Sequence, residues 1–240
     1  MPKEMPRQVR VIKSSATKFY TMKLDMHLHS NISSDAITLP ETIMKVAARK
    51  GITIAITDHN SIGAWPVFEK LSKELNQPVI LGEEIKCVVK GKCVGEIVGL
   101  FMNEHVKRGS PEYVLDKLHE QNALAMVVHP FDSFRNAFLN IEQHIKKIDI
   151  VEVFNSRTYF SEHNSKAKEL AMKYKLPMIA NSDAHTPEEI GTSWTEVKAD
   201  TIEEARRQLI QGRVSLHEVK SPVTVHLTTP LAKYGLIKDR

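Results

Sequence analysis

The stretch that decides the fold is Thr-Ile-Ala-Ile-Thr-Asp-His-Asn at residues 53–60, an apolar run that ends abruptly in polar residues. A short, uninterrupted apolar run is typical of a parallel strand that is buried on both faces. Comparable runs recur along the chain, so the pattern predicts a series of strands. They lie near residues 22–26, 52–56, 78–82, 124–128, 148–153 and 177–181, with a seventh near 193–197.

Amphipathic helices alternate with these strands. Pro40 opens one helix and Gly51 closes it, because proline suits the first helical turn and glycine suits the end. One feature interrupts the alternation: two apolar segments at residues 85–89 and 94–101 meet at Lys90-Gly91. This arrangement predicts an antiparallel hairpin inserted between βα units.

Repeated βα units form either an open doubly wound sheet or a closed barrel. No glycine-rich phosphate loop follows the first predicted strand, whereas polar residues follow nearly every strand. That distribution favours a barrel, in which residues from many strand ends meet at one face.

The length of 240 residues, with 42% hydrophobic and 26% charged residues, suits one large domain. We expect an N-terminal extension over residues 1–21 and a single domain over 22–240. Residues 213–240 contain apolar pieces without clear periodicity, and their placement is left open.

The charge balance, Lys+Arg 33 against Asp+Glu 29, gives a net charge of +4 and does not indicate stable nucleic-acid binding. The apolar runs are too short to cross a membrane, and the first 22 residues lack the apolar core of a secretory signal. Cys87 and Cys93 are too few for a disulfide framework. These features predict a cytoplasmic protein with two free thiols and no membrane partner.

The strand ends carry residues that bind metals. His27 and His29 are two apart at the end of the first strand, so both side chains can point to the same side and bind one ion. Asp183 and His185 repeat this spacing after the sixth strand. The candidate ligands at strand ends are His27, His29, Asp35, His59, Glu84, His129 and Asp183, with His185 as an eighth.

One ion cannot use all of these ligands, so we predict two or three divalent ions. Imidazole and carboxylate without thiolate suit Zn²⁺, Mn²⁺ or Fe²⁺. Such clusters activate a bridging water and neutralise phosphoryl charge, which points to hydrolysis of a phosphate ester.

Five motifs of the chain, in order, resemble those of the PHP (polymerase and histidinol phosphatase) superfamily. They are Asp-Met-His-Leu-His-Ser at 25–30, Thr-Asp-His-Asn at 57–60, Gly-Glu-Glu-Ile at 82–85, His-Pro at 129–130 and Ser-Asp-Ala-His at 182–185. The resemblance covers about residues 23–191. It implies a distorted (β/α)7 barrel with a hairpin insertion, a centre of two or three metal ions, and phosphoesterase chemistry.

The resemblance also implies how the ligands are shared. The first ion would be held by His27, His29, Glu84 and Asp183. Glu84 would bridge to a second ion that also uses His129. The third ion would be held by Asp35, His59 and His185.

The chain departs from this pattern at one position. Many three-metal members place a histidine on the hairpin strand, within a His-x-x-Gly-Leu-like segment, whereas this chain has Glu96 there. Strand alternation leaves the direction of Glu96 open, because both faces of the strand carry apolar residues. We predict that Glu96 touches a metal, directly or through water; the alternative is an ordinary solvated residue.

Phosphate binding needs cations besides the metals. Arg135 and Arg157 both follow predicted strand ends, and an arginine can hold a phosphate with two parallel hydrogen bonds. We predict that both act on the substrate phosphate.

The sequence therefore predicts a metal-dependent phosphatase or phosphodiesterase. It would hydrolyse a phosphate ester of a small molecule or nucleotide through a hydroxide activated by two or three metal ions. Two alternatives stay open: a metal-stabilised binding or regulatory module without activity, and an amidohydrolase-like hydrolase.

Overall fold

The computed structural model of the protein describes residues 20–237. Most of the predicted N-terminal extension lies outside these residues. One nine-stranded sheet forms the centre, in the order β7-β6-β5-β4-β3-β2-β1-β8-β9. The strands are β1 Thr21–Asp25, β2 Ile52–Ile56, β3 Val79–Val89, β4 Lys92–Leu100, β5 Leu124–Val127, β6 Ile150–Asn155, β7 Met178–Asn181, β8 Trp194–Lys198 and β9 Val214–His217.

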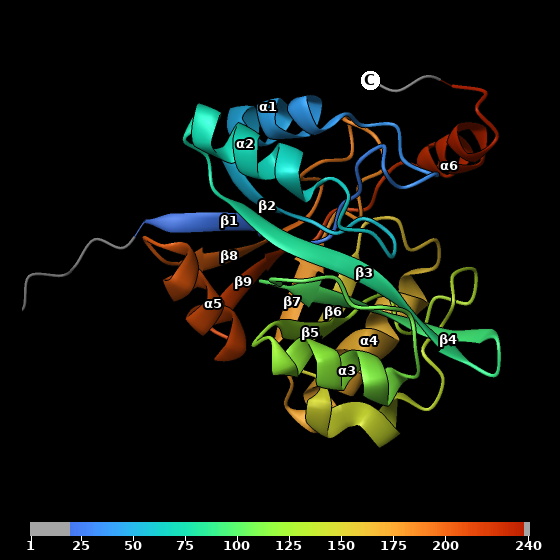
Figure 1. Cartoon of the computed structure of the whole chain (residues 1–240). Helices are drawn as coiled ribbons and strands as arrows, with labels where there is room; N and C mark the ends of the chain where they lie inside the picture. Colours follow the sequence, from blue (N-terminus) through green and yellow to red (C-terminus); the bar gives the residue numbers. More distant parts are fainter. Residues whose placement is uncertain (1–19, 238–240) are drawn as a thin grey trace, which may run out of the picture.

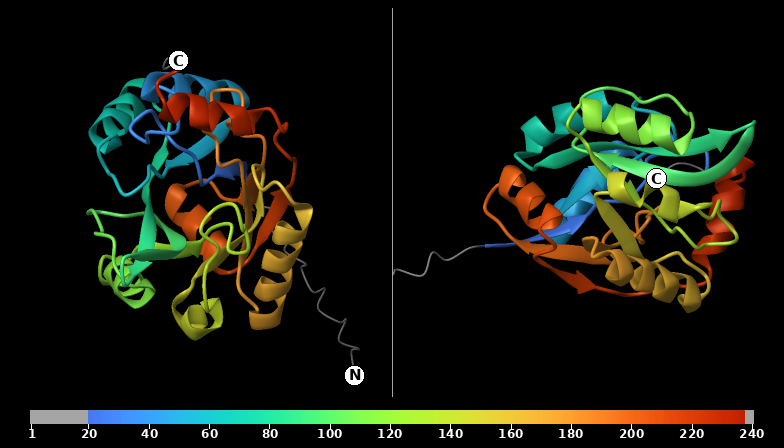
Figure 2. Two further views of the ribbon diagram at one scale, coloured as in Figure 1. Left: turned by 90° about the vertical axis from the view of Figure 1, so that its right-hand side faces the viewer. Right: turned by 90° about the horizontal axis from the view of Figure 1, so that it is seen from below.

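The sheet curls into a nearly closed barrel, since β7 at one edge also contacts β8 and β9 at the other (Figures 1 and 2). Helices surround the sheet, and most of them cover its outside, as predicted for an α/β barrel. They are α1 Pro40–Lys50, α2 Trp65–Leu75, α3 Pro111–Glu120, α4 Ser161–Tyr174, α5 Ile202–Ile210 and α6 Val225–Lys233, with a 3-10 helix η1 at Ile141–Lys147.

The ends of α1 and α3 follow the sequence signals. Pro40 lies in the first turn of α1, and Gly51 ends this helix with a φ of 62° in the left-handed region. The hydroxyl of Ser110 accepts a hydrogen bond from the backbone N–H of Tyr113 and so caps α3.

The apolar residues pack on both faces of the sheet. Ile54 and Ile56 of β2 belong to the cluster between the sheet and the outer helices, whereas Ala55 belongs to the cluster inside the barrel. Ala205 and Leu209 of α5 join the inner cluster, so α5 closes the barrel at the end where β1 begins (Figure 1). The carboxyl ends of the parallel strands stay open for a site.

The hairpin differs from the prediction in its length. β3 is one continuous strand that contains both the predicted strand near 78–82 and the first arm of the hairpin. It turns through Lys90 and Gly91, whose φ angles of 50° and 75° suit a tight two-residue turn into antiparallel β4. Glu83 and Glu84 lie between the two predicted segments, and both side chains are buried within the strand.

The sheet does not consist of seven consecutive βα units, as the predicted (β/α)7 barrel would require. The predicted seventh strand exists as β8, but it runs antiparallel to β1. The connection over residues 182–193 contains no helix that could carry the chain back across the sheet, which a parallel strand requires. The segment 213–240, left open by the sequence, contributes β9 and α6.

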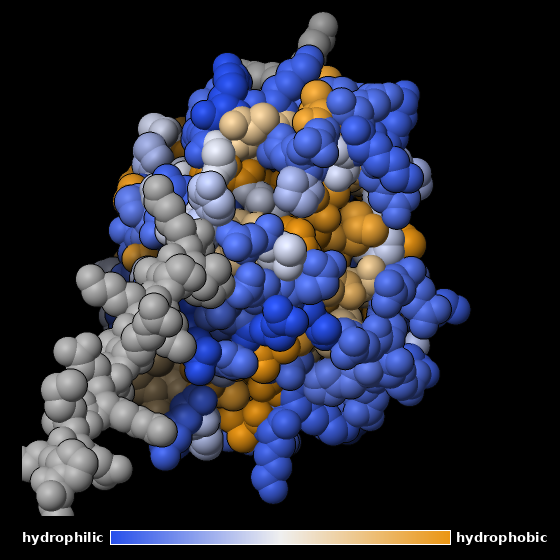
Figure 3. Space-filling model, turned by 90° about the vertical axis from the view of Figure 1, so that its left-hand side faces the viewer, coloured by the Kyte–Doolittle hydropathy of each residue, from blue (hydrophilic) through white to orange (hydrophobic). Residues whose placement is uncertain are grey.

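The side of the molecule on which β1 begins is mostly hydrophilic, with separated hydrophobic patches (Figure 3). No described helix combines the length and hydrophobicity needed to span a membrane. Cys87 and Cys93 are free thiols, as predicted.

Candidate metal centre

His27 and His29 follow β1 and lie buried at the open end of the barrel. Their Nε2 atoms lie 3.5 and 3.4 Å from Oε2 of Glu84, and also 3.5 and 3.4 Å from Oδ1 of Asp183. Four ligand atoms around one tetrahedral zinc would lie about 3.3–3.4 Å apart. The spacing of these four side chains therefore fits a single ion.

The unsatisfied atoms of this group support the same conclusion. Nε2 of His27, Nε2 of His29 and Oε2 of Glu84 are buried without a hydrogen-bond partner in the described residues. Leaving a buried polar atom unpaired is costly. Three such atoms directed at one point are explained by an ion that would accept their lone pairs.

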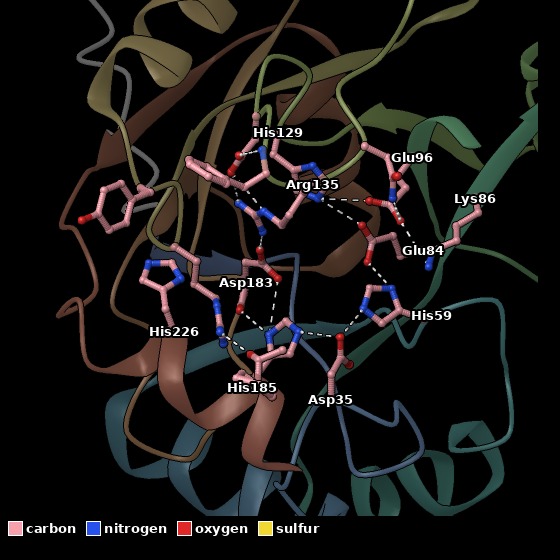
Figure 4. Close-up of a pocket in the computed structure, with 17 residues that line it drawn as sticks. Asp35, His59, Glu84, Lys86, Glu96, His129, Arg135, Asp183, His185 and His226 are labelled. Atoms are coloured by element: carbon pink, nitrogen blue, oxygen red, sulfur yellow. Dashed lines mark hydrogen bonds and ion pairs between the residues drawn. The ribbon is translucent and has the colours of Figure 1, made fainter. Parts of the chain in front are cut away.

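Glu84 is the centre of a larger cluster (Figure 4). Its Oε2 lies 2.8 Å from Nδ1 of His59, although the two atoms are not in hydrogen-bonding geometry, and its Oε1 lies 3.2 Å from Nε2 of His129. On the far side of His59, Nε2 lies 3.4 Å from Oδ2 of Asp35, which is 3.8 Å from Nε2 of His185. The donor set thus extends beyond one ion, and Glu84 is placed to bridge two.

Glu96 points into this cluster. Its side chain is buried, and Oε2 lies 3.8 Å from Nε2 of His129. His59, Glu84 and Glu96 also form a group of donor atoms within 4.8 Å of one another. Burial first, and then the negative charge of Glu84, raise the pKa of Glu96. The open question of its direction is answered, whereas its role as a ligand stays a prediction.

Two of the predicted ligands have a strained backbone. His129 has a φ of 30° and Asp183 a φ of 55°, in a region that residues other than glycine rarely adopt. Strain of this kind persists where the surrounding structure enforces it, often at functional sites. Here it directs the two side chains toward the same cavity.

Glu152 was not predicted as a site residue, yet it orients the site. Its carboxylate accepts hydrogen bonds from Nδ2 of Asn155 and Nδ2 of Asn181, both at 2.9 Å, and from the backbone N–H of His129 at 3.0 Å. It also lies 3.0 Å from Nδ1 of His27. This contact leaves Nε2 of His27 facing the other donors, as is usual for metal-binding histidines.

The loops on either side are held by two further buried carboxylates. Asp58 accepts hydrogen bonds from the hydroxyls of Ser30 and Ser33 at 2.6 and 2.7 Å. Asp25 accepts hydrogen bonds from Ser182 and Gly191, and burial raises its pKa to about 6. Both carboxylates fix the segments that carry predicted ligands.

Arg135 reaches into the centre. Its Nη2 donates to Asp132 at 3.0 Å, to Asn155 at 3.2 Å and to Thr158 at 3.3 Å, while Nη1 pairs with Oδ2 of Asp183. Asp183 thus offers Oδ1 to the histidines and Oδ2 to the arginine. The guanidinium borders the same cavity as the metal donors, and its action on phosphate stays a prediction.

Arg157 also lines the cavity and, like Arg135, is paired with a carboxylate. Its Nη1 donates to Glu189 at 3.1 Å, and Nη2 donates to Thr229 and to the carbonyl of Val225 in α6 at 2.5 and 3.3 Å. Glu189 in turn accepts from the backbone N–H of His185. Arg157 therefore links α6 to the loop of a predicted ligand, and its action on phosphate stays a prediction.

Metal binding should release protons. Burial lowers the pKa of His27, but the carboxylates of Asp183, Glu152 and Glu84 outweigh it and hold the pKa well above the ordinary value. The carboxylates of Glu84 and Asp35 likewise raise the pKa of His59 against its burial. Because the surrounding carboxylates favour the protonated form of both imidazoles, an ion that binds their nitrogens competes with protons, and affinity should fall as pH decreases.

Calorimetric titration of Mn²⁺ at pH 7 in buffers of different ionisation enthalpy would measure this release. We expect the apparent heat to vary linearly with the buffer enthalpy, with a slope of roughly one to two protons per chain. Equal heats in all buffers would contradict the prediction.

The cavity shared by these groups has a volume of about 660 Å³. Asp35, His59, Glu84, Glu96, His129, Asp183 and His185 line it together with Lys86, Arg135 and Arg157 (Figure 4). The structure thus brings the predicted metal ligands and both predicted arginines to one place.

Comparison with known proteins identifies the family. A family profile described as PHP-associated matches residues 161–214. An uncharacterized protein of Methanocaldococcus jannaschii, MJ1587, is 38% identical over 149 residues, which cover 56% of this chain and 82% of the relative. A second protein of that organism, MJ0417, is 37% identical over 189 residues, 76% of this chain and 73% of the relative.

A solved structure shares the fold. It is a two-domain protein from Bacteroides vulgatus that contains a predicted PHP-like metal-dependent phosphoesterase. The TM-score is 0.69 at 20% identity, and the match covers 84% of this chain and 66% of that chain. The chain belongs to the same family as MJ1587 and MJ0417, and the PHP-associated profile and the shared fold agree with the resemblance to the PHP superfamily stated from its motifs.

Proposed function

We propose that the protein is a metal-dependent phosphoesterase that hydrolyses the phosphate ester of a small molecule. The observation that carries this proposal is the convergence of buried imidazole and carboxylate donors with a cationic guanidinium in one cavity. Metal donors alone would suit several hydrolases. Arg135 beside Asp183 adds a charge that suits an anionic substrate, which distinguishes a phosphate ester from an amide.

The donors fit two or three divalent ions. His27, His29, Glu84 and Asp183 would hold the first ion. Glu84, His129 and Glu96 would hold the second, and Asp35, His59 and His185 the third. Divalent ions held here would supply an activated water and neutralise charge on the phosphoryl group. The mixture of nitrogen and oxygen donors suits Zn²⁺, Mn²⁺ or Fe²⁺.

The residues around the donors would position the substrate. Asp132, Asn155 and Thr158 hold the guanidinium of Arg135, so little side-chain freedom would be lost when it binds a phosphate oxygen. Lys86, across the site from His226 in Figure 4, adds a further positive charge to those of Arg135 and Arg157.

The function is tested by incubating Mn²⁺-loaded protein with a panel of phosphorylated metabolites and measuring released phosphate. We expect release from at least one ester, with Glu84→Gln prepared in parallel to expose any contaminating phosphatase. If fully loaded protein releases no phosphate, the proposal fails in favour of a module without activity. Hydrolysis of amides alone would favour the amidohydrolase-like alternative.

Glu96 should be needed for the full metal content. Glu96→Ala removes the only carboxylate that β4 directs at His129, so the variant should lose one ion per chain after loading with Mn²⁺ and dialysis. Lys86→Met is the matched control, because Lys86 lies 3.9 Å from Glu96 but offers no donor to a metal. Parental metal content in Glu96→Ala would show that Glu96 is not a ligand.

A further inference from the structure

Four aromatic side chains gather at one side of the cavity mouth, and we call them the aromatic rim: Phe134, Tyr159, Phe160 and His226. The ring centroid of Tyr159 lies 5.0 Å from that of Phe160, 6.1 Å from that of Phe134 and 5.7 Å from that of His226. Phe134 and Phe160 are 5.7 Å apart. The rings thus form a continuous group rather than isolated surface residues.

The rim is unusually open to solvent for large apolar rings. Phe134 is 71% exposed, Tyr159 50% and Phe160 48%. Burying such rings is favourable, so a contiguous exposed group indicates a surface that a ligand covers. The contacts within the rim are edge-on or tilted, so the rings are not stacked face to face on one another, and their exposed surface remains open to a flat ligand.

The rim belongs to the same cavity as the metal donors. Phe134, Tyr159 and His226 line it together with His59, Glu84, Asp183 and His185. Phe134 directly precedes Arg135, and Tyr159 follows Arg157 by two residues. His226 and the hairpin residues Lys86 and Glu96 lie on opposite sides of the site in Figure 4. A ligand whose phosphate meets Arg135 would therefore place its next group against the rim.

We propose that the aromatic rim binds the base of a mononucleotide whose phosphate lies at the metal centre. The inference deepens the proposed phosphoesterase function and rests on it. Nucleobases stack on aromatic side chains whatever their sequence, because every base has a flat π-face. A sugar phosphate without a base would leave the rim uncovered, so the rim would select nucleotides over such esters.

A single nucleotide suits the site better than a nucleic-acid strand. The cavity of about 660 Å³ is of the size that takes one drug-sized molecule. α6 borders it through Thr229 and Pro230. The net charge of +4 provides little general attraction for a polyanion.

The test compares two ligands that differ only by the base. Methylenephosphonate analogues of adenosine 5′-monophosphate and ribose 5-phosphate, which cannot be hydrolysed, are titrated into Mn²⁺-loaded protein by calorimetry. We expect the adenosine analogue to bind on the order of five- to a hundredfold more tightly. Phe134→Ala and Tyr159→Ala should each reduce this ratio by at least fivefold. Phe134→Trp should keep it, because the ring is retained.

Tyr113→Ala is the matched control, since Tyr113 is a 39% exposed aromatic residue of α3 outside the cavity lining. It should leave the ratio unchanged. Equal affinity for the two analogues would overturn the inference. An affinity ratio that stays at the parental value in Phe134→Ala and also in Tyr159→Ala would overturn it as well. Tighter binding of a 5′-phosphorylated hexanucleotide than of the mononucleotide analogue would also overturn it, in favour of a strand.

Hydrolysis is measured separately on the natural esters. Release of phosphate from ribose 5-phosphate and the nucleotide with equal kcat/KM would leave the phosphoesterase function intact and overturn the base selection. A base-dependent affinity without any hydrolysis would remove the proposed function and still support the rim as a base-binding surface.

Discussion

Replacing Glu84 with glutamine should remove at least one metal ion per chain and lower phosphoesterase turnover by more than roughly a hundredfold. Glu84 lies within 3.5 Å of a ring nitrogen of His27, His29, His59 and His129. Glutamine keeps the shape but replaces one charged oxygen with an amide nitrogen, which has no lone pair for a metal. Metal analysis after Mn²⁺ loading and dialysis, with kcat measured on the same sample, gives both quantities.

Glu83 supplies the matched control for this substitution. It is the preceding residue of β3 and equally buried, but it lies on the other face, where it pairs with His105 at 2.9 Å and accepts from the backbone N–H of Val106 at 3.2 Å. Glu83→Gln should retain the parental metal content. If Glu84→Gln keeps all its ions and its rate, Glu84 does not bridge the centre.

Most of the ligands were predictable because they follow buried strands, whereas Glu84 and Glu96 lie within β3 and β4. The spacing of His27 and His29, and of Asp183 and His185, placed paired side chains on one side of a strand end. The carboxyl ends of parallel strands meet at one end of a barrel, so residues far apart in sequence were expected to converge. The structure confirms the barrel and places the predicted ligands together.

The buried carboxylates of Glu152 and Asp25, which hold the segments that carry the ligands, were not predicted because their hydrogen-bond partners are distant in sequence. Glu152 bonds Asn181 and lies beside His27, and Asp25 bonds Gly191. A buried acid at a strand end is visible in the sequence, but its hydrogen-bond partner is fixed only when the barrel closes. The signal that such residues offer is a carboxylate or amide within an otherwise apolar strand.

The C-terminal segment could not be placed for a different reason. α6 has no fully buried residue, and Leu227 and Leu231 remain exposed at 65% and 38%. A helix without a buried stripe leaves no periodic pattern in the sequence. Its position is instead determined by polar contacts from Arg157, which the sequence suggested only as a phosphate ligand.

Arg135→Ala should lower kcat/KM for the best phosphate ester roughly ten- to a hundredfold while leaving the metal content unchanged. A hydrogen bond between charged groups contributes about 1.5–3 kcal/mol, which corresponds to that range. The metal should stay because Arg135 contacts Oδ2 of Asp183, whereas Oδ1 faces His27 and His29. Steady-state kinetics and metal analysis on one preparation provide the measurement.

Two further variants separate phosphate binding from general effects of charge. Arg135→Lys keeps the charge but not the planar pair of donors, so its kcat/KM should lie between the parent and Arg135→Ala. Arg49→Ala removes an exposed arginine from the last turn of α1 and should match the parent. Parental kcat/KM in Arg135→Ala would exclude a phosphate contact. If Arg135→Ala loses both activity and metal, Arg135 instead holds the metal ligand Asp183 in place. A residue that contacts only the substrate phosphate would not change the metal content.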